Sequence, residues 1–280
     1  MRMFKLALGA GHGLFTSGKR CLKSLDANET REWWLNDRVC DYIYDIIKFY
    51  DGVSVLRMDD SDDGHDDVRL SERANTANSW GADLYLSIHH NAGIYGGSGG
   101  GIVAFCHPNA SSASVQWRDA LYAELIRLTG LKGNMSEPLS TANFQILRQT
   151  KMPAVLLELG FMDSSTDAPV ILTDEYAKSC AQAIVNVIVA RKGLKKKQES
   201  ASGTLIYKMV SVDLPVLKKG SKCNAVKTLQ ILLNSHDFGL AVDGSFGTLT
   251  LNAVLEYQEE TGLVADGSVG PATWKKILGV

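Results

Sequence analysis

Residues 84–91 are the stretch that most constrains how this chain can fold. The apolar run Leu84-Tyr-Leu-Ser-Ile stops abruptly at His89-His90-Asn91. A short apolar run bounded by turn-forming residues is typical of a buried strand. In open α/β sheets, ligands and reactive groups collect just beyond the carboxyl ends of the strands. A histidine at such an end is either a structural cap or part of a site, and other segments of the chain help to decide.

Two further apolar runs are followed by a residue that could bind a metal or transfer a proton. The run over residues 4–8 is followed by His12 among glycines, and the run over 153–157 leads directly into Glu158. A glutamate at the end of a buried run is seldom buried unless it is paired or bound to a metal. A second carboxylate, Glu32, lies where a helix with an apolar stripe is expected to begin.

The order of these segments predicts an α/β domain with a mostly parallel, twisted sheet flanked by helices. Predicted strands alternate with helical stretches, which is typical of βαβ units. The strands are expected over 4–8, 53–57, 84–91, 101–106 and 153–157, and the later helices over 68–80, 115–129 and 176–190. The glycine-rich segment 96–101 lies between two predicted strands. It therefore fails the dinucleotide-binding fingerprint and indicates a flexible loop near a site.

Changes in composition predict three parts. Residues 1–192 form the α/β domain, residues 193–214 have the charged and small side chains of a linker, and residues 215–280 form a small three-helix domain. The last part contains the phrase Asp-Gly-Ser-x-Gly-x-x-Thr twice, over 243–250 and 266–273. Each copy is typical of a turn followed by the start of a helix.

Bulk properties exclude several classes of protein. The net charge of −2 gives no reason to expect nucleic acid as a partner, and no apolar stretch is long enough to span a membrane. The five cysteines form no Cys-x-x-Cys pair, which favours free thiols over a thiolate zinc or redox site. The first residues lack the features of a signal peptide, so synthesis in the cytoplasm is expected. Composition leaves the oligomeric state open.

The strand ends together supply the ingredients of a metal site. Imidazoles come from His12, His89 and the neighbouring His90, and carboxylates come from Glu32 and Glu158. Two imidazoles and one carboxylate are a known ligand set for catalytic zinc, and a second carboxylate is the usual general base. The residues alone therefore favour a metallohydrolase. They leave open which glutamate is the ligand and which of the paired histidines binds.

Five phrases follow one another in order along the first domain. They are Gly9-Ala-Gly-His12-Gly, Glu32 with Asn36, Leu70-x-x-Arg73-x-Asn75, Ser87-Ile-His89-x-Asn91, and Leu147-Arg148 ahead of Pro153-Ala-Val-Leu-Leu-Glu158. With these phrases, residues 1–192 resemble the Amidase_3 family of zinc-dependent N-acetylmuramoyl-L-alanine amidases. Residues 215–280 resemble the peptidoglycan-binding module PG_binding_1, whose repeated phrase is present in both copies.

The resemblance implies roles for four residues. His12, Glu32 and His89 would bind Zn²⁺, and Glu158 would be the catalytic acid and base. Glu29 is the alternative to Glu32, but only Glu32 has an asparagine four residues later.

Other residues are implied less directly. His90 occupies a position that varies in the family, which makes it a bystander or a substrate contact. Asn91 and Arg148 are further candidate substrate contacts. Arg73 is expected to hold the fold or a loop, with no part in the reaction.

The implied reaction is hydrolysis of the amide between the lactyl group of N-acetylmuramic acid and L-alanine of the stem peptide. The implied partner is bacterial peptidoglycan, with no nucleic acid and no membrane insertion. Alternatives are another zinc peptidoglycan hydrolase, such as a stem-peptide peptidase or a deacetylase, and a non-catalytic wall-binding protein. The missing export signal favours a phage endolysin released through a holin, with a bacterial autolysin as the second choice.

Overall fold

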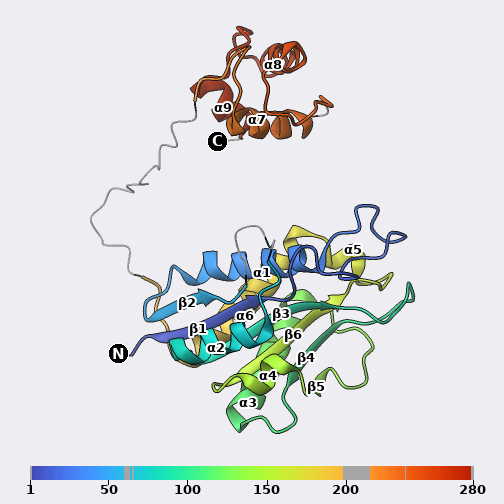
Figure 1. Ribbon diagram of the computed structural model, residues 1–280, viewed down its shortest axis with the longest axis vertical. Coiled ribbons are helices and arrows are strands. Elements are labelled where there is room, and N and C mark those ends of the chain that lie inside the picture. Colours follow the sequence, from blue (N-terminus) through green and yellow to red (C-terminus); the bar gives the residue numbers. More distant parts are fainter. Residues whose placement is uncertain (1, 60–63, 65, 198–214, 237, 279–280) are drawn as a thin grey trace. The chain divides into compact units, whose positions relative to one another are not determined.

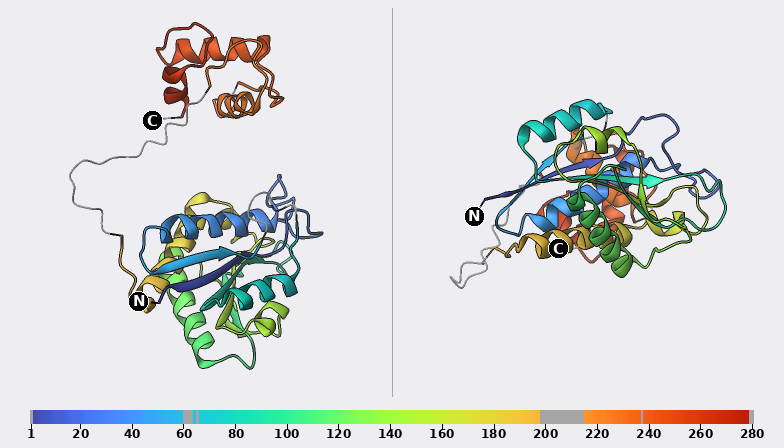
Figure 2. Two further views of the ribbon diagram at one scale, coloured as in Figure 1. Left: turned by 60° about the vertical axis from the view of Figure 1, so that its left-hand side comes forward. Right: turned by 90° about the horizontal axis from the view of Figure 1, so that it is seen from below.

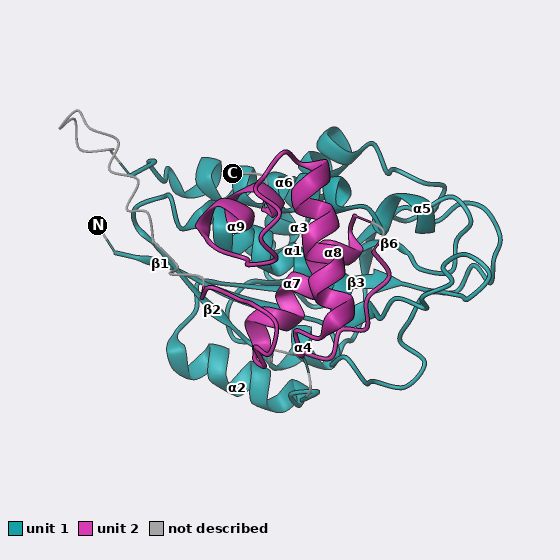
Figure 3. Cartoon of the chain, turned by 90° about the horizontal axis from the view of Figure 1, so that it is seen from above, with its two compact units in different colours: residues 1–200 teal, residues 201–280 magenta. Residues whose placement is uncertain are grey.

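The computed structural model describes residues 2–59, 64, 66–197, 215–236 and 238–278. The chain divides into two compact units, residues 1–200 and 201–280, which are coloured separately in Figure 3. Most of the predicted linker, over 198–214, lies outside the described residues. Its first residues are joined to unit 1, because the amide of Asp51 donates to the carbonyl of Lys195 and the amide of Lys197 donates to the carbonyl of Phe49.

The described residues of unit 1 form a six-stranded sheet with the order β2-β1-β3-β6-β4-β5 (Figure 1). Strands β2, β1, β3 and β6 run parallel, β4 is antiparallel to β6, and β5 is parallel to β4. The strands are β1 Phe4–Ala10, β2 Val53–Arg57, β3 Leu84–Asn91, β4 Ile102–Cys106, β5 Leu139–Thr141 and β6 Ala154–Phe161. The predicted mostly parallel sheet is confirmed.

Helices cover both faces of this sheet. Figure 2 (right) shows α2 and α4 on one side and α1, α3 and α6 on the other. The helices are α1 Glu32–Ile47, α2 Leu70–Trp80, α3 Ser112–Thr129, α4 Gln145–Gln149, α5 Ala168–Ile171 and α6 Asp174–Lys192. No strand was predicted between the helix over 115–129 and the strand over 153–157, yet β5 lies there. This strand has three residues on the sheet edge and none is buried, so it carries no alternating pattern that the sequence could reveal.

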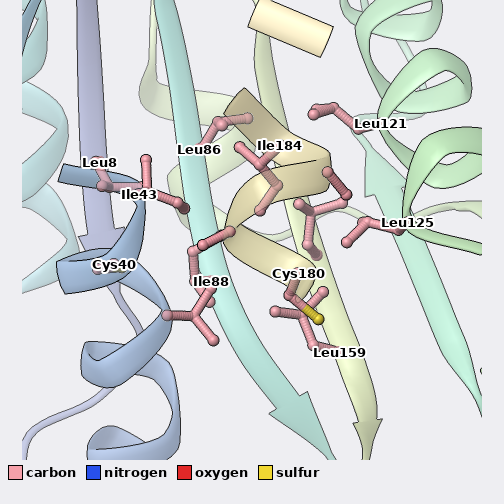
Figure 4. Packing of buried hydrophobic residues seen from close by; sticks show 14 of the residues in the cluster. Leu8, Cys40, Ile43, Leu86, Ile88, Leu121, Leu125, Leu159, Cys180 and Ile184 are labelled. Atoms are coloured by element: carbon pink, nitrogen blue, oxygen red, sulfur yellow. The ribbon is translucent and has the colours of Figure 1, made fainter. Parts of the chain in front are cut away.

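Apolar side chains fill the space on both sides of the central strands. In Figure 4, Leu86 and Ile88 of β3 lie among side chains of α1 and α6, including Ile43 and Ile184. Tyr85, the alternate residue of β3, belongs to a second cluster with residues of α2 and α4. Because both faces are covered, the parallel strands are continuous apolar runs and do not alternate with polar residues.

Strand alternation separates the two histidines at the end of β3. Successive side chains of a strand point to opposite faces. His90 has the same parity as Leu86 and Ile88 and therefore points toward α1. His89 has the parity of Tyr85 and Ser87, on the face that α2 and α4 cover.

Unit 2 contains three helices in the described residues, α7 Asn224–Asn234, α8 Thr248–Glu260 and α9 Pro271–Ile277, as predicted. They enclose a separate apolar cluster that includes Leu229, Val254 and Trp274. Each copy of the repeated phrase is held by a buried glutamine from the preceding helix. Gln230 bonds the first turn and Gln258 the second, and in both copies the amide oxygen accepts from the glycine N–H.

Replacing Gln258 by leucine should destabilise unit 2 by about 2–4 kcal/mol, because two or more buried polar groups lose their partner. The Gln258 side chain donates to the carbonyl of Ser268 at 2.9 Å and accepts from the amide of Gly267 at 2.9 Å. Hydrogen exchange should speed up in α8 and α9, while unit 1 stays protected. The exposed neighbour variant Glu259→Gln is the control, and equal exchange in both variants would contradict the prediction.

Candidate metal centre

His12 lies in a sharp turn just beyond β1, with φ of +64°. Arg73 of α2, which is 3% exposed, holds this turn. Its guanidinium donates to the carbonyls of His12 at 2.9 Å and of Ala10, and its Nε donates to the carbonyl of Val68 at 2.8 Å. These contacts agree with the interpretation of Arg73 as a residue that holds a loop. They also fix the backbone from which the His12 imidazole projects.

Glu32 is the first residue of α1 and is 1% exposed. Its amide donates to the carbonyl of Lys19 at 3.0 Å, and its Oε2 lies 3.6 Å from the Lys19 ammonium. Asn36, one helical turn later, donates from Nδ2 to Glu32 Oε1 at 3.4 Å and to the carbonyl of Gly11 at 3.1 Å. The spacing of four residues therefore has a physical role, because Asn36 orients the carboxylate.

The structure brings His12, Glu32 and His89 together. Their potential ligand atoms all lie within 4.8 Å of one another. His12 Nε2 is 3.4 Å from Glu32 Oε2, and His89 Nδ1 is 3.1 Å from Glu32 Oε1. Two ligands on one tetrahedral zinc ion lie about 3.3 Å apart when each is about 2.0 Å from the metal. Gly11 makes the approach possible, because a Cβ there would lie 2.1 Å from His89 Cε1.

Glu158 occupies the strand next to His89. The two residues are direct register partners of β6 and β3, and both belong to the sheet face opposite α1. Glu158 is half-buried, and its Oε2 has no hydrogen-bond partner among the described residues. Burial raises the pKa of Glu158 to about 7, and the charge of Glu32 acts in the same direction.

The charge states of the cluster suit a divalent cation. Burial lowers the pKa of His12 to about 4. Burial alone would raise the pKa of Glu32, but the hydrogen bond and charge of His89, together with His12 and Lys19, lower it to about 2. At neutral pH the His12 ring is therefore neutral and Glu32 is ionised, which are the forms that bind a metal.

The remaining predicted site residues are not among the three clustered ligand residues. The backbone amide of His90 nevertheless donates to Glu32 Oε1 at 3.4 Å. His90 is 2% exposed and its Nδ1 bonds Asn36 Oδ1 at 2.8 Å, on the α1 side of the sheet. Asn91 is half-buried, and its side chain accepts from the amide of Ala92 at 2.8 Å. Arg148 is exposed on α4, where Nη1 donates to Asn143 Oδ1 at 2.6 Å.

Glu29, the alternative ligand, also lies outside the cluster. It pairs with Arg20 at 3.3 Å and has φ of +48°.

Models of two known protein families match separate parts of the chain. Residues 6–190 match the Amidase_3 family model, N-acetylmuramoyl-L-alanine amidase, over nearly all of unit 1. The chain belongs to this amidase family. A second model, a peptidoglycan binding domain, matches residues 223–277 of the amidase. The chain is therefore a peptidoglycan hydrolase with a domain of the wall-binding type.

Individual relatives agree with the family model. The N-acetylmuramoyl-L-alanine amidase CwlM of Bacillus licheniformis is 32% identical over 195 residues, which cover 69% of this chain and 71% of that protein. The endolysin of Bacillus phage SPP1 is 30% identical over 190 residues, covering 68% and 66%. The catalytic domain of the amidase CwlV from Bacillus (Paenibacillus) polymyxa var. colistinus has a TM-score of 0.60 at 24% identity, covering 69% and 100%. This last likeness shows the fold alone.

Two residues of the amidase near the cluster, Ser87 and Lys19, had no role assigned to them from the sequence. Ser87 Oγ lies 3.1 Å from His89 Nε2, which leaves Nδ1 of that ring toward Glu32. The contact of Ser87 with His89 could have been predicted from the sequence, because residues two apart in a strand share a face. The contact of Lys19 with Glu32 could not, because it depends on how the loop after β1 returns to the start of α1.

Proposed function

We propose that this amidase cleaves the amide between the lactyl group of N-acetylmuramic acid and L-alanine with the help of a zinc ion. His12, Glu32 and His89 would hold the ion. The observation that carries the proposal is the convergence of these three side chains from the turn after β1, from α1 and from β3, with Glu158 on the strand next to β3.

The residues present fit a zinc ion. Glu32 Oε2 is buried and has no hydrogen-bond partner among the described residues, so a carboxylate oxygen is available at the centre of the cluster. Ser87 and Asn36 contact the proposed ligands from outside and fix their orientation, as partners of metal ligands commonly do. When bound, zinc supplies Lewis acidity that polarises the scissile carbonyl and activates the attacking water.

Glu158 would move the proton in both halves of the reaction. Its carboxylate takes a proton from the attacking water and then delivers that proton to the departing amide nitrogen. The second step is needed because an amide nitrogen leaves poorly unless it is protonated. A carboxyl group whose pKa burial raises to about 7 can both accept and release a proton near neutral pH.

The biological setting is also a proposal. The likeness to a phage endolysin supports a role in wall lysis. Release through a holin stays a prediction from the sequence, and a bacterial autolysin, as the likeness to the Bacillus licheniformis amidase suggests, is the alternative. The peptidoglycan binding domain in unit 2 would hold the enzyme on the wall. Within the described residues, no helix is long and apolar enough to cross a membrane. Asn91 and Arg148 stay predicted substrate contacts.

Removal of the metal should abolish wall lysis, and zinc should restore it. The full chain is expected to carry about one zinc per molecule, the number that one three-ligand site predicts. Digests of purified walls should contain new L-alanine amino termini and no new reducing sugars.

Other products would identify the alternatives. New D-amino acid termini would indicate a stem-peptide peptidase, and released acetate would indicate a deacetylase. Undiminished lysis by protein that contains no metal would contradict the zinc proposal. It would indicate a glycosidase, because the carboxylate pair of such an enzyme needs no metal.

A further inference from the structure

The loop between β3 and β4, residues 92–101, includes the glycine-rich segment 96–101 that was predicted to be flexible, but hydrogen bonds fix it in place. It contains six glycines and no charged side chain, a composition that predicts flexibility. Hydrogen bonds instead hold it along much of its length. The amide of Ser165 donates to the carbonyl of Gly97 at 2.8 Å, and the amide of Gly101 donates to the Asp167 carboxylate at 2.6 Å.

One residue, Asp163, fixes the front of this loop. Its Oδ2 accepts from the amides of Gly93 at 2.8 Å, Ile94 at 2.9 Å and Tyr95 at 2.8 Å. Its backbone carbonyl accepts from the amide of Gly96 at 2.7 Å. Asp163 is itself only 5% exposed, so the anchor is part of the packed domain.

Tyr95 is held in an unfavourable position by this anchor. Its φ is +53°, a region that aromatic residues rarely adopt, and its side chain is 88% exposed. Such strain persists only where the surrounding structure imposes it, and it concentrates at functional sites. Folding gains almost no apolar burial from a ring in solvent. The arrangement therefore points to a ligand outside the chain.

The loop lies on the edge of the sheet that carries the metal centre. It follows His89 after two residues of β3, and Asp163 follows β6, the strand of Glu158. A Cβ built on Gly96 would lie 4.0 Å from a methyl of Leu22, in the segment between β1 and α1. Figure 1 shows the loops after β1 and β3 on the same side of the domain.

The chemistry of the loop favours a neutral ligand with an apolar face. A tyrosine ring offers a large rigid contact area at low entropic cost, with a hydroxyl at its edge. The loop has no charged side chain to pair with the carboxylates of a stem peptide. The pyranose rings of peptidoglycan carry apolar C–H faces and neutral hydroxyl and amide groups, which match such a surface.

We propose that Tyr95 is a stacking platform for a sugar ring of the glycan strand, held rigid by Asp163, on the sheet edge that carries the proposed metal centre. This inference rests on the proposed function for its substrate class. It makes Tyr95 a specificity residue that distinguishes glycan-linked peptides from free lactoyl-peptides.

The test compares two substrates that share the scissile amide. One is a disaccharide-peptide, and the other is a lactoyl-peptide without sugar rings. Tyr95→Ala should lower kcat/KM about tenfold on the first, mainly through KM, and leave the second within about twofold. Tyr95→Phe keeps the ring and should match the wild type on both. Phe49→Ala removes another exposed ring, 60% exposed beyond the end of α1, and should change neither.

Two results would overturn the proposal. Equal losses of Tyr95→Ala on both substrates would mean that the residue acts on the shared amide or on the loop fold. No loss on either would mean that the ring contacts no substrate.

A binding measurement separates this inference from the proposed reaction. In the full chain with labelled tyrosine rings, the Tyr95 resonance is identified by its absence in Tyr95→Phe. Peptide-free glycan strands should shift this resonance and leave that of half-exposed Tyr44 unchanged. If the wild type cleaves neither substrate, the proposed function fails, yet a shifted Tyr95 resonance still supports the platform and an unshifted one overturns it.

Discussion

Replacing Glu158 by glutamine should lower kcat/KM by about 10²–10⁴-fold, the range typical for loss of a general acid or base. Glutamine has almost the same shape but cannot take the proton from the attacking water. The metal content should stay at the wild-type value, because Glu158 is not among the three clustered ligand residues. Metal analysis and kinetics on the same preparation check both points. A Glu158→Gln protein with wild-type activity would remove this residue from the mechanism.

The pH profile gives a second readout of the same residue. The base must be ionised, so kcat/KM of the wild type should rise with pH on its acid side. Burial raises the pKa of Glu158 to about 7, whereas a cation in the adjacent cluster would lower it, because opposite charge favours the ionised form. The acid limb should therefore fall at or below about 7. Residual activity of Glu158→Gln should lack this limb.

Replacing His89 by alanine should remove the metal and lower activity by about 10³-fold or more, since a bound zinc contributes several kcal/mol of stabilisation to the transition state. His90→Ala is the matched neighbour. His90 is buried and bonded to Asn36, so its loss should cost about 1–3 kcal/mol of stability and leave about one metal per chain.

The variants His89→Ala and His90→Ala should therefore differ in opposite ways in metal content and in stability. His89→Ala should unfold like the wild-type apoprotein, and His90→Ala should unfold earlier but still bind metal. Metal analysis together with denaturant unfolding measures both. Loss of metal from His90→Ala and its retention by His89→Ala would show that the ligand assignment within β3 is reversed.

Much of the fold was accessible from the sequence because periodicity is local. The apolar runs over 84–91 and 153–157 end at polar residues, and parallel strands place such ends on one edge of a sheet. The helical spacing of α1 and the two copies of the Asp-Gly phrase likewise depend on neighbours in the chain. Strand β5 was not predicted, because its three exposed or half-exposed edge residues are too few to show a periodic pattern.

The site itself depended on both levels. Residue types that follow the apolar runs indicated a zinc-type ligand set, and the resemblance to amidases selected Glu32 over Glu29. The last of these strands, predicted over 153–157, continues through Glu158 to Phe161. Strand alternation predicts that His89 and His90 point to opposite faces of the sheet. The sequence leaves open which of the two faces α1, because both faces of a parallel sheet are apolar. Packing of α1 and α6 on the Leu86 side decided that question.

Other features were decided only by tertiary contacts. The glycine-rich loop 92–101 has the composition of a flexible segment, yet Asp163, nearly seventy residues away in sequence, holds it and presents Tyr95. Lys19 reaches Glu32 because the chain returns to the start of α1. The sequence by itself determined the α/β architecture, the three-helix domain and the kinds of side chain available for chemistry, because these follow from local periodicity and residue type. Which of those side chains meet, and which loop is rigid, depended on contacts between residues far apart in the chain.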